Sequence, residues 1–591
     1  MALIVQKFGG TSVADHEKIL AAARKAVRAH QQGNRVVVVV SAMGKNTDQL
    51  VALAQQVCED PPAREMDMLL STGEQVSVAL MAMAVHGLGS EAVSLTGAQI
   101  GIRTDSTHTK ARIRSISTQR ITDLLDAGKI VIAAGFQGID EDANITTLGR
   151  GGSDTTAVAL AAVLNADACE IYTDVDGVYT TDPRILPEAR HMDRVSYDEM
   201  LELASLGAGV MHSRSIEFGK KFAVPIHVRS SFSDVTGTVI GDRCESLGRP
   251  VCGAALTRDE ARLTMEGVPD RPGMSLGIFN RLAAENIPID MIVQNVGEEG
   301  RADVSFTVLK NDLPAALAAT EAAVQDLGAQ RVSFDDDVAK VSAVGLGMAT
   351  QAGVAHEMFR ALADAGINLQ MITTSEIKIS VLVPRQHGLD ALRVVHRQFA
   401  LDRPPEEASD AAVTAANTQP VDAEEVVARL QAMERLAIDD IALDSNHGRV
   451  TVREVPDRPG VAAELFERVA AAGVFVDMIV QSTARGCVAN LSFTVPLHDL
   501  ETSRRAAAEF LEQVGGGTVC TSSAVAKLSV SGIGMRSHTS VATRMFDSLA
   551  RDQINVDMIN TSEVQVNAVV DQKKAAQGLA GLRLAFQDVM R

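Results

Sequence analysis

The chain contains no tryptophan and only 3 tyrosines among its 591 residues. Proteins that bind single-stranded nucleic acids stack the bases on aromatic side chains, so this scarcity argues against such a surface. The net charge is −20, from 55 Lys and Arg against 75 Asp and Glu. Because a phosphate backbone repels an acidic protein, the charge excludes the same class of partner, and we expect no nucleic acid to bind.

Paired cysteines and long apolar runs are also missing. The six cysteines are scattered without a Cys-x-x-Cys pair, a spacing that fits neither a zinc site nor a disulfide framework. No apolar run approaches the ~18 residues that cross a bilayer. A strand-like run beginning at Leu3 leaves no room for a signal peptide. We expect a cytoplasmic protein with no membrane partner and no metal site of its own.

The first 245 residues alternate between strand-like and helix-like patterns, while 46% of all residues are hydrophobic and 22% charged, as in globular proteins. Residues 36–40 are five consecutive valines, which is typical of a parallel strand buried on both faces. The alternation predicts an α/β domain over residues 1–245, with a mainly parallel sheet and helices on both faces. We expect strands at 3–8, 36–40, 92–95, 130–134 and 168–173, and helices at 14–31, 73–86, 118–126 and 153–164.

The rest of the chain is a repeat. Asp270-Arg271-Pro272-Gly273 recurs as Asp457-Arg458-Pro459-Gly460, and Thr374-Ser375-Glu376 recurs as Thr561-Ser562-Glu563, both at an offset of 187 (457 − 270, 563 − 376). A weaker repeat inside each unit predicts two halves, each of β-α-β-β-α-β order, which is a ferredoxin-like α+β module. We expect modules at 260–335, 336–400, 445–520 and 521–591, with a linker at 401–435 that is rich in Ala, Pro, Glu and Thr.

Four segments of the first domain carry residues suited to chemistry, and we place each near the end of a predicted strand, where open α/β sheets bind ligands. In residues 7–12, glycines allow N–H groups to approach a phosphate and Lys7 adds a positive charge; a plain turn is the alternative. Residues 41–47 offer small hydroxyl groups. Residues 71–74 place Glu74 at a predicted helix start, where a solvated residue that suits the helix dipole is the alternative.

The fourth segment, residues 147–156, places three glycines before a helix, and a helix N-terminus is a ready anion site. Arg150 within it is a candidate carboxylate clamp. Further on, residues 172–179 and Asp182-Pro183-Arg184 form a polar loop after a strand. This loop suits a nucleotide base and ribose, although spacing alone fits a plain turn equally well.

Together, residues 7–12, 149–156 and 173–184 resemble the signature segments of aspartate kinases, within the amino acid kinase superfamily. The paired modules, with Asp270-Arg271-Pro272-Gly273 and Thr373-Thr374-Ser375-Glu376, resemble ACT domains, which bind small effectors. The resemblance covers nearly the whole chain except the linker, and the two ACT pairs are similar to the four-ACT form of the enzyme. It implies phosphoryl transfer from ATP, bound with Mg²⁺, to L-aspartate, feedback inhibition by lysine or threonine or both, and a homodimer that pairs through ACT modules.

The resemblance also implies roles for individual residues. Lys7, Glu74, Arg150 and Asp154 would be catalytic: Lys7 would stabilise the transferred phosphoryl group, Arg150 would clamp the α-carboxylate of aspartate, and Glu74 would bind its ammonium group. Asp154 would either orient Lys7 or manage Mg²⁺. The ATP site would comprise Lys7, Phe8, Gly9, Gly10, Ser41, Thr173, Asp174, Tyr179, Thr180, Asp182 and Arg184. The aspartate site would comprise Thr47, Glu74, Arg150, Gly152 and Ser153.

For the effector sites, Asp270 would take the ammonium group of an amino acid and the N–H groups after Gly273 its carboxylate. The alternative is that Asp270 only caps its helix. Between the units, Gly353, Lys378 and Ser380 become Ser540, Gln565 and Asn567, which points to a lost or changed ligand in the fourth module. The implied effector residues are Asp270, Gly273, Asp290, Gln294, Val354, Asn368, Leu369, Ser375, Glu376, Asp457, Gly460, Asp477, Gln481, Asn555, Ser562 and Glu563.

Two other functions remain open from the residues. One is an amino acid kinase with another acceptor, such as glutamate, N-acetylglutamate or a nucleotide; Arg150 with Glu74 and the ACT modules weigh against it. The other is a non-catalytic amino acid sensor, which the intact Lys7 and glycine loops disfavour. We therefore expect a feedback-regulated kinase that phosphorylates aspartate.

Overall fold

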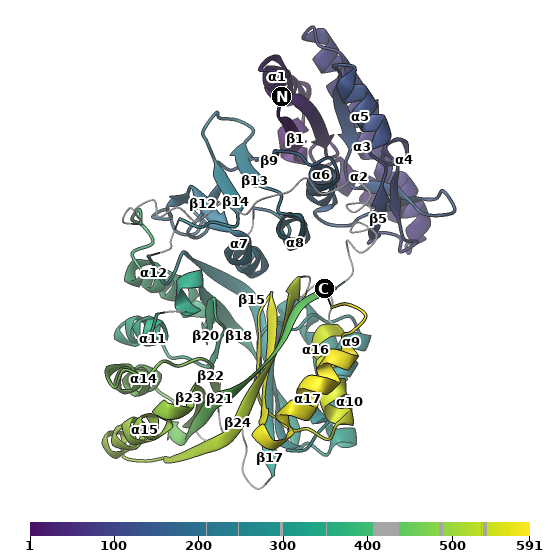
Figure 1. Ribbon diagram of the computed structural model, residues 1–591. Helices are drawn as coiled ribbons and strands as arrows, with labels where there is room; N and C mark the ends of the chain where they lie inside the picture. The colour runs from purple at the N-terminus through teal and green to yellow at the C-terminus, as the bar shows by residue number, and fades with distance from the viewer. Residues whose placement is uncertain are drawn as a thin grey trace.

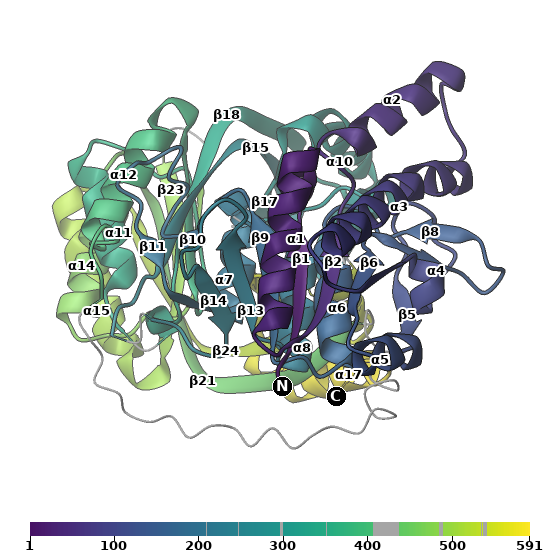
Figure 2. The same cartoon turned by 90° about the horizontal axis from the view of Figure 1, so that it is seen from above.

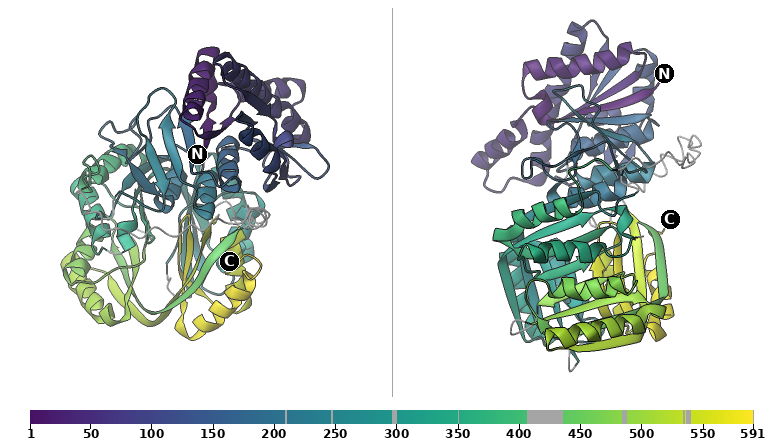
Figure 3. Two further views of the ribbon diagram at one scale, coloured as in Figure 1. Left: turned by 45° about the horizontal axis from the view of Figure 1, so that its top comes forward. Right: turned by 90° about the vertical axis from the view of Figure 1, so that its left-hand side faces the viewer.

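The computed structural model describes residues 1–590 apart from 209, 246–247, 296–299, 350, 406–435, 484–487, 534 and 536–539. The expected linker thus falls almost entirely outside the described residues. An N-terminal α/β domain lies on top of a larger assembly of strands and helices made by the C-terminal modules (Figures 1 and 3).

An eight-stranded sheet forms the centre of the N-terminal domain, in the order β12-β14-β13-β9-β1-β2-β6-β3. Six of its strands, from β13 to β3, run parallel, whereas β14 is antiparallel to β13. The valines of the central strand β2 are fully buried, as their pattern predicts. The strands are β1 (Leu3–Phe8), β2 (Arg35–Val40), β3 (Ala92–Leu95), β6 (Ile130–Ala134), β9 (Ala168–Thr173), β12 (Arg194–Ser196), β13 (Ile226–Ser230) and β14 (Thr238–Gly241).

Helices cover both faces of this sheet (Figure 2), so the predicted α/β fold is confirmed. The helices are α1 (His16–Gln31), α2 (Asn46–Val57), α3 (Ala63–Gly87), α4 (Gly97–Ile100), α5 (Gln119–Asp126), α6 (Gly152–Val163), α7 (Tyr197–Leu203) and α8 (Ser213–Phe222). A small second sheet contains β4 (Ile102–Thr104), β5 (Ile113–Ile116), β7 (Gln137–Ile139) and β8 (Ile145–Thr147), and a hairpin contains β10 (Val178–Tyr179) and β11 (His191–Met192).

Helix α3 differs from its prediction, because it begins at Ala63 rather than near Gly73. Residues 71–74 therefore lie inside a helix and not at a helix start. Gly73 suggests a boundary in the sequence, but its role is a close contact: a Cβ there would lie 2.8 Å from the Cβ of Ala42. The helix is long and apolar enough to cross a membrane, yet half of its most apolar stretch is buried inside the domain, and it carries the buried carboxylates Asp67 and Glu74.

The C-terminal modules share one twelve-stranded sheet, in the order β16-β17-β15-β18-β20-β19-β22-β23-β21-β24-β26-β25. Its strands are β15 (Gly253–Pro269), β16 (Ile292–Asn295), β17 (Arg301–Leu309), β18 (Arg331–Val344), β19 (Met371–Thr374), β20 (Lys378–Pro384), β21 (Ala437–Pro456), β22 (Ile479–Thr483), β23 (Val488–Pro496), β24 (Thr518–Ile533), β25 (Val556–Thr561) and β26 (Gln565–Asp571). Its helices are α9 (Met274–Ala284), α10 (Leu313–Leu327), α11 (Val354–Asp364), α12 (Gly388–Gln398), α14 (Val461–Ala471), α15 (Leu500–Val514), α16 (Ser540–Arg551) and α17 (Gln572–Ala585).

The two modules of a unit do not simply follow one another along the chain, although the sequence predicted that they do. Residues 253–257 of the long strand β15 pair with residues 340–344 of β18, in the second module, while the rest of β15 pairs in the first module. The second module therefore takes one strand from before the first module, and the first module is inserted within it. Strands β21 and β24 repeat this arrangement in the second unit.

The two units face each other as near copies. Strand β19 of module 2 pairs with β22 of module 3, and β16 of module 1 lies beside β25 of module 4, where Gln294 donates to the carbonyl of Val556 at 2.6 Å. Helices α11 and α14 lie on one side of the assembly and α9 and α16 on the other (Figure 1). Methionines fill the centre between them, namely Met291, Met371, Met478 and Met558. The sheet edges of the four modules are thus joined within one chain.

Candidate functional site

A cleft of about 1420 Å³ opens at the C-terminal ends of β1 and β2 and at the N-terminus of α6. It brings together residues from segments that are far apart in the sequence. The predicted site residues that line it are Lys7, Gly10, Ser41, Thr47, Glu74, Arg150, Gly152, Ser153 and Asp154. The catalytic and aspartate-binding residues expected from the sequence therefore meet at one place.

Lys7 lies near the end of β1 and is almost completely buried. Its Nζ lies 2.6 Å from an oxygen of Asp154, in the first turn of α6. This ion pair agrees with the role of orienting Lys7, one of the two expected for Asp154. Gly10 is needed for packing, since a Cβ there would lie 2.9 Å from the carbonyl oxygen of Ala42 and 3.2 Å from that of Gly44.

Glu74 lies in the middle of α3 and is only 3% exposed. One of its carboxylate oxygens accepts a hydrogen bond from the N–H of Ala42 at 3.1 Å, and the other has no partner among the described residues. Burial raises the pKa of Glu74 to about 7. A buried oxygen without a partner is costly, so this carboxylate is suited to a cationic ligand group in the cleft.

Arg150 projects from a glycine turn whose residues Gly149 and Gly151 have φ angles of +75° and +70°. A side chain at position 151 would overlap His212, whose Cβ would lie 2.4 Å away. The Arg150 side chain is exposed to the cleft and makes no hydrogen bond or ion pair within the part of the chain that the structure describes. Ser153 lies next to it at the start of α6, so an anion there would meet a guanidinium and helix N–H groups together.

Two residues predicted for ATP have side chains that face elsewhere. Phe8 is fully buried and stacks on Tyr172 at a ring distance of 4.7 Å, so only its backbone is available to a nucleotide. Thr180 is fully buried and bonds His396 of module 2 at 3.0 Å, so its side chain is not exposed to a nucleotide in this arrangement. The burial of both side chains follows from the packing of strands and domains, which a short sequence motif does not reveal.

Of the remaining predicted ATP residues, Gly9 follows β1, and the others lie at the end of β9, the strand next to β1, or after it; none of them lines the cleft described above. Thr173 donates to Asp174 at 3.1 Å, and Tyr179 meets the ring of His191 edge-on. Arg184 is 84% exposed and pairs with Asp182 at 2.8 Å. Gly9 borders Tyr172 through a backbone hydrogen bond of 3.3 Å, which places this loop beside the Lys7 segment.

Several cations that line the cleft were not predicted from the sequence, because no glycine motif or repeat marks them. They come from the loop between β4 and β5 and from α8, and they are Lys110, Arg112, Arg214 and Lys221. Asp67 was also missed: it is fully buried and binds the N–H of Thr109 at 3.0 Å and the hydroxyl of Thr147 at 2.5 Å. Pro288, Leu309 and Asp312 of module 1 also border the cleft.

The aspartates of the repeated Asp-Arg-Pro-Gly motif are not helix caps. Helices α9 and α14 begin after Gly273 and Gly460, and neither has a side-chain cap. Asp270 instead accepts from Asn555 of module 4 at 2.7 Å, and Asp457 accepts from Asn368 of module 2 at 2.9 Å. Both aspartates therefore lie at equivalent contacts between modules.

The glutamines that follow these aspartates differ between the units. Gln294 accepts a hydrogen bond from Ser275 at 2.7 Å, so both ends of its amide group are bonded. Its counterpart Gln481 donates to the carbonyl of Leu369 at 2.8 Å, but its own oxygen has no partner among the described residues, because Ala462 replaces the serine. A cavity of about 10 Å³ beside Gln481 and Asp457 is smaller than an amino acid, so a ligand there must open the interface.

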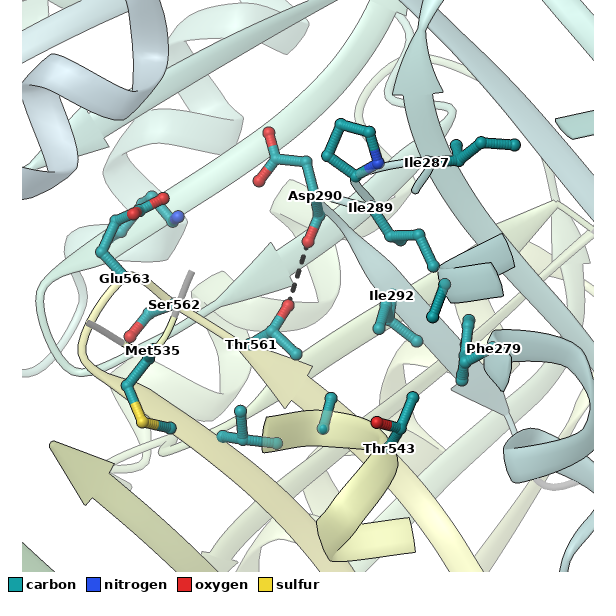
Figure 4. A pocket seen from close by; sticks show the side chains of 15 residues that line it. Phe279, Ile287, Ile289, Asp290, Ile292, Met535, Thr543, Thr561, Ser562 and Glu563 are labelled. Carbon is teal, nitrogen blue, oxygen red and sulfur yellow. Dashed lines mark hydrogen bonds between the residues drawn. The ribbon is translucent and has the colours of Figure 1, made fainter. Parts of the chain in front are cut away.

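The repeated Thr-Ser-Glu segments line two equivalent cavities. The first, of about 100 Å³, lies between modules 1 and 4, where Thr561 donates to the carbonyl of Asp290 at 3.0 Å and Ser562 and Glu563 lie nearby (Figure 4). The second, of about 400 Å³, lies between modules 2 and 3. Its lining includes Val354, Glu376, Asp477 and Ser375, and the hydroxyl of Ser375 has no hydrogen-bond partner in the part of the chain that the structure describes. The second cavity is therefore larger than the first, and it also contains a hydroxyl group that a ligand could bind.

The residue differences between modules 2 and 4 at positions 378 and 565 and at positions 380 and 567 have another explanation than a lost ligand. Lys378 is buried against Glu202 of the N-terminal domain at 2.8 Å, and Ser380 bonds Ser342 at 2.7 Å. Gln565, the counterpart of Lys378, has no such ion pair to make. The difference at this position therefore reflects contact with the N-terminal domain, and it gives no evidence that module 4 lost its ligand.

Comparisons with known proteins agree with this site and fold. The amino acid kinase family model matches residues 2–230, and the ACT domain model matches residues 341–399, 451–510 and 528–586. The aspartate kinase Ask_LysC of Stutzerimonas stutzeri is 52% identical over 406 residues, which are 68% of this chain and 98% of that protein. An aspartokinase of Thermus thermophilus is 47% identical over 405 residues, 68% of this chain and 100% of that protein.

Two solved structures are similar over different lengths. Aspartate kinase from Synechocystis is 39% identical, with a TM-score of 0.53, and the match covers 99% of this chain and 98% of that one. E. coli aspartokinase III in complex with aspartate and ADP is 26% identical, with a TM-score of 0.57, over 67% of this chain and 100% of that one. The chain therefore belongs to the aspartate kinase family, with an amino acid kinase domain followed by ACT domains.

Proposed function

We propose that the cleft transfers the γ-phosphoryl group of ATP to the β-carboxylate of L-aspartate, with Glu74 and Arg150 holding the amino acid. The observation that carries this proposal is a pair of opposite charges without partners: the buried oxygen of Glu74 and the free guanidinium of Arg150 line one cleft. An α-amino acid presents an ammonium and a carboxylate, which match these two groups. Thr47, Gly152 and Ser153 complete the aspartate site.

The reaction needs no general base, because the carboxylate of aspartate is already ionised at neutral pH. Catalysis is then a matter of position and charge. Lys7, held by Asp154, faces the phosphoryl group as it moves, and Gly9, Gly10 and Ser41 contact the phosphates. ATP enters with its own Mg²⁺. The base and ribose lie beyond β9, beside Thr173, Asp174, Tyr179, Asp182 and Arg184.

The test is ATP consumption by the purified chain with each acceptor. We expect ADP to form with L-aspartate and not with L-glutamate, N-acetyl-L-glutamate or a nucleoside monophosphate. The shorter D- and L-serine and the amide L-asparagine serve as controls, because they lack the β-carboxylate. ADP formation that is equal with and without aspartate would contradict the proposal, and no ADP with any acceptor would favour the non-catalytic sensor.

The ACT modules supply feedback inhibition in this proposal, as the first step of a route to lysine, threonine and methionine requires. E. coli aspartokinase III has been solved with lysine and aspartate. We assign lysine to the cavity of modules 2 and 3, since Glu376 and Asp444 line it and suit a cation, whereas the third carboxylate, Asp477, already pairs with Lys527 at 2.6 Å. We assign threonine to the two Asp-Arg-Pro-Gly sites, where Asp270 or Asp457 takes the ammonium group.

Asp457→Ala should weaken inhibition by threonine more than Asp270→Ala does, and the double variant should be nearly insensitive. Removing the carboxylate leaves a bound ammonium without its partner, at a cost of about 2–5 kcal/mol where the contact is buried. The stronger effect belongs to Asp457 because the free oxygen of Gln481 can also accept from the threonine hydroxyl, while Ser275 occupies that of Gln294. Titrating activity against threonine measures both effects.

Asp390→Ala is the matched control, because this exposed aspartate on α12 pairs only with Arg393 on the same helix. Uninhibited turnover should be equal in the parent and all four variants. A double variant inhibited like the parent would show that neither aspartate binds an effector.

The expected homodimer and cytoplasmic location also remain proposals. The edges of β16, β19, β22 and β25, on which modules of two chains would pair, are joined within this chain. In a homodimer, the second copy of the chain would therefore bind at a surface other than these strand edges. The exposed face of α3 is the best candidate, because it presents Met68, Val76, Leu80 and Met83 without a charge among them.

A further inference from the structure

Glu202 is a buried carboxylate that the reaction does not use. It lies on α7 of the kinase domain and is fully buried. One of its oxygens is 2.8 Å from the Nζ of Lys378, in module 2, and the other accepts the N–H of Glu563, in module 4, at 2.9 Å. Glu199, one turn earlier, accepts the N–H of Leu346 at 3.2 Å. One short helix thus holds the kinase domain to two different modules.

The partners of Glu202 also line the cavity between modules 1 and 4. Lys378 and Glu563 both border it, together with Ser562 and the acidic Asp290 (Figure 4). A ligand that enters this cavity meets the same loop whose N–H binds Glu202. The equivalent cavity between modules 2 and 3 lacks this connection, since Gln565 stands where Lys378 would be and is not among the described residues that line that cavity.

On its other side, α7 leads to the aspartate site through packing contacts. Tyr197 of α7 donates to the carbonyl of Val224, just after α8, at 2.6 Å. At the start of α8, Arg214 donates to the carbonyls of Leu148 at 2.7 Å and Ala111 at 3.0 Å. His212 leaves no room for a side chain at Gly151, so the start of α8 supports both sides of the turn that carries Arg150.

We propose that Glu202 and Lys378 are positioning residues, which set the Arg150 turn through α7 and α8 and make the kinase respond to a ligand in the cavity of modules 1 and 4. The inference rests on the proposed function, effector-regulated phosphorylation of aspartate. A ligand that displaces the loop at Glu563 removes one hydrogen bond from Glu202 and loosens the support of Arg150. The affinity for aspartate then falls, while the affinity for ATP, which is bound at other loops, changes little.

The test compares Glu202→Gln, Lys378→Gln and the double variant with the parent, all as the full chain. We expect the KM for aspartate to rise about tenfold in each single variant, with the KM for ATP within about twofold, since coupling of this kind is typically 5–150-fold. Inhibition by L-lysine and L-threonine, each titrated separately, should weaken for the ligand that occupies this cavity. The two effects in the double variant should not add, because both changes break the same contact.

Arg449→Met is the control for loss of a partly buried ion pair, because Arg449 pairs with Asp557 between two strands of the regulatory sheet, β21 and β25. It should leave the KM for aspartate unchanged. If Glu202→Gln fails to fold, as thermal melting would show, Lys378→Gln carries the test, since glutamine already stands at the equivalent position 565. Folded variants with the KM for aspartate and the inhibition of the parent would overturn this coupling alone. A parent that consumes no ATP with aspartate would instead overturn the proposed function.

Discussion

Lys7→Ala should remove most of the turnover while the fold remains intact. Lys7 brings a positive charge to the end of β1, at the mouth of the cleft, and Asp154 fixes its position at 2.6 Å. The transferred phosphoryl group gathers negative charge on its oxygens as the reaction proceeds. A positioned donor at such a point typically contributes ~3–4 kcal/mol, or about a hundredfold or more in kcat. Steady-state kinetics at saturating ATP and aspartate measures this loss.

Lys7→Met is the companion variant, because it keeps the packing of the lysine stem and removes only the charge. Both variants leave Asp154 without its partner, so thermal melting should accompany the kinetics. Asp154→Asn should lower kcat by less than Lys7→Ala, since it frees the lysine without removing it. Turnover of Lys7→Met within about threefold of the parent would contradict the role of the charge.

The five strands that the sequence predicted in the kinase domain match the structure to within a residue, whereas the short strands of the second sheet, the hairpin and the strands after β9 were not predicted. Strands β3, β6 and β9 have the predicted bounds, and β2 begins one residue early. These strands are runs of β-branched and apolar residues whose burial on both faces decides their structure locally. The offset of 187 residues likewise revealed the duplication, because repeated sequence implies repeated structure.

The features that the sequence did not reveal depend on contacts between distant segments. The interior position of Glu74 arises because α3 packs against the loop at Ala42, so Gly73 marks a contact rather than a helix boundary. The pairing of β15 with both modules is decided by its partner strands, which a module-by-module interpretation cannot include. Thr180 similarly looks like part of a nucleotide motif, but its surroundings come from module 2.

The affinity for aspartate should depend on pH through Glu74. Burial raises the pKa of this carboxyl group to about 7, so it is mostly protonated at pH 6 and mostly ionised at pH 8. Only the ionised form pairs with the ammonium group of aspartate. The apparent KM for aspartate should therefore rise about tenfold as the pH falls from 8 to 6, one pH unit below the pKa giving about one ionised group in ten. The KM for ATP should change little over this range.

Glu74→Gln separates this effect from every other titration in the enzyme. Glutamine keeps an oxygen for the N–H of Ala42 but cannot pair with an ammonium group, so the KM for aspartate should be raised at every pH. Loss of a buried charge partner costs about 2 kcal/mol or more, or roughly 30-fold in KM. The pH dependence should disappear at the same time, because no group with a pKa near 7 remains to bind the ligand. A variant that keeps the slope of the parent would place the titrating group elsewhere, and a variant with the KM of the parent would show that Glu74 does not bind aspartate.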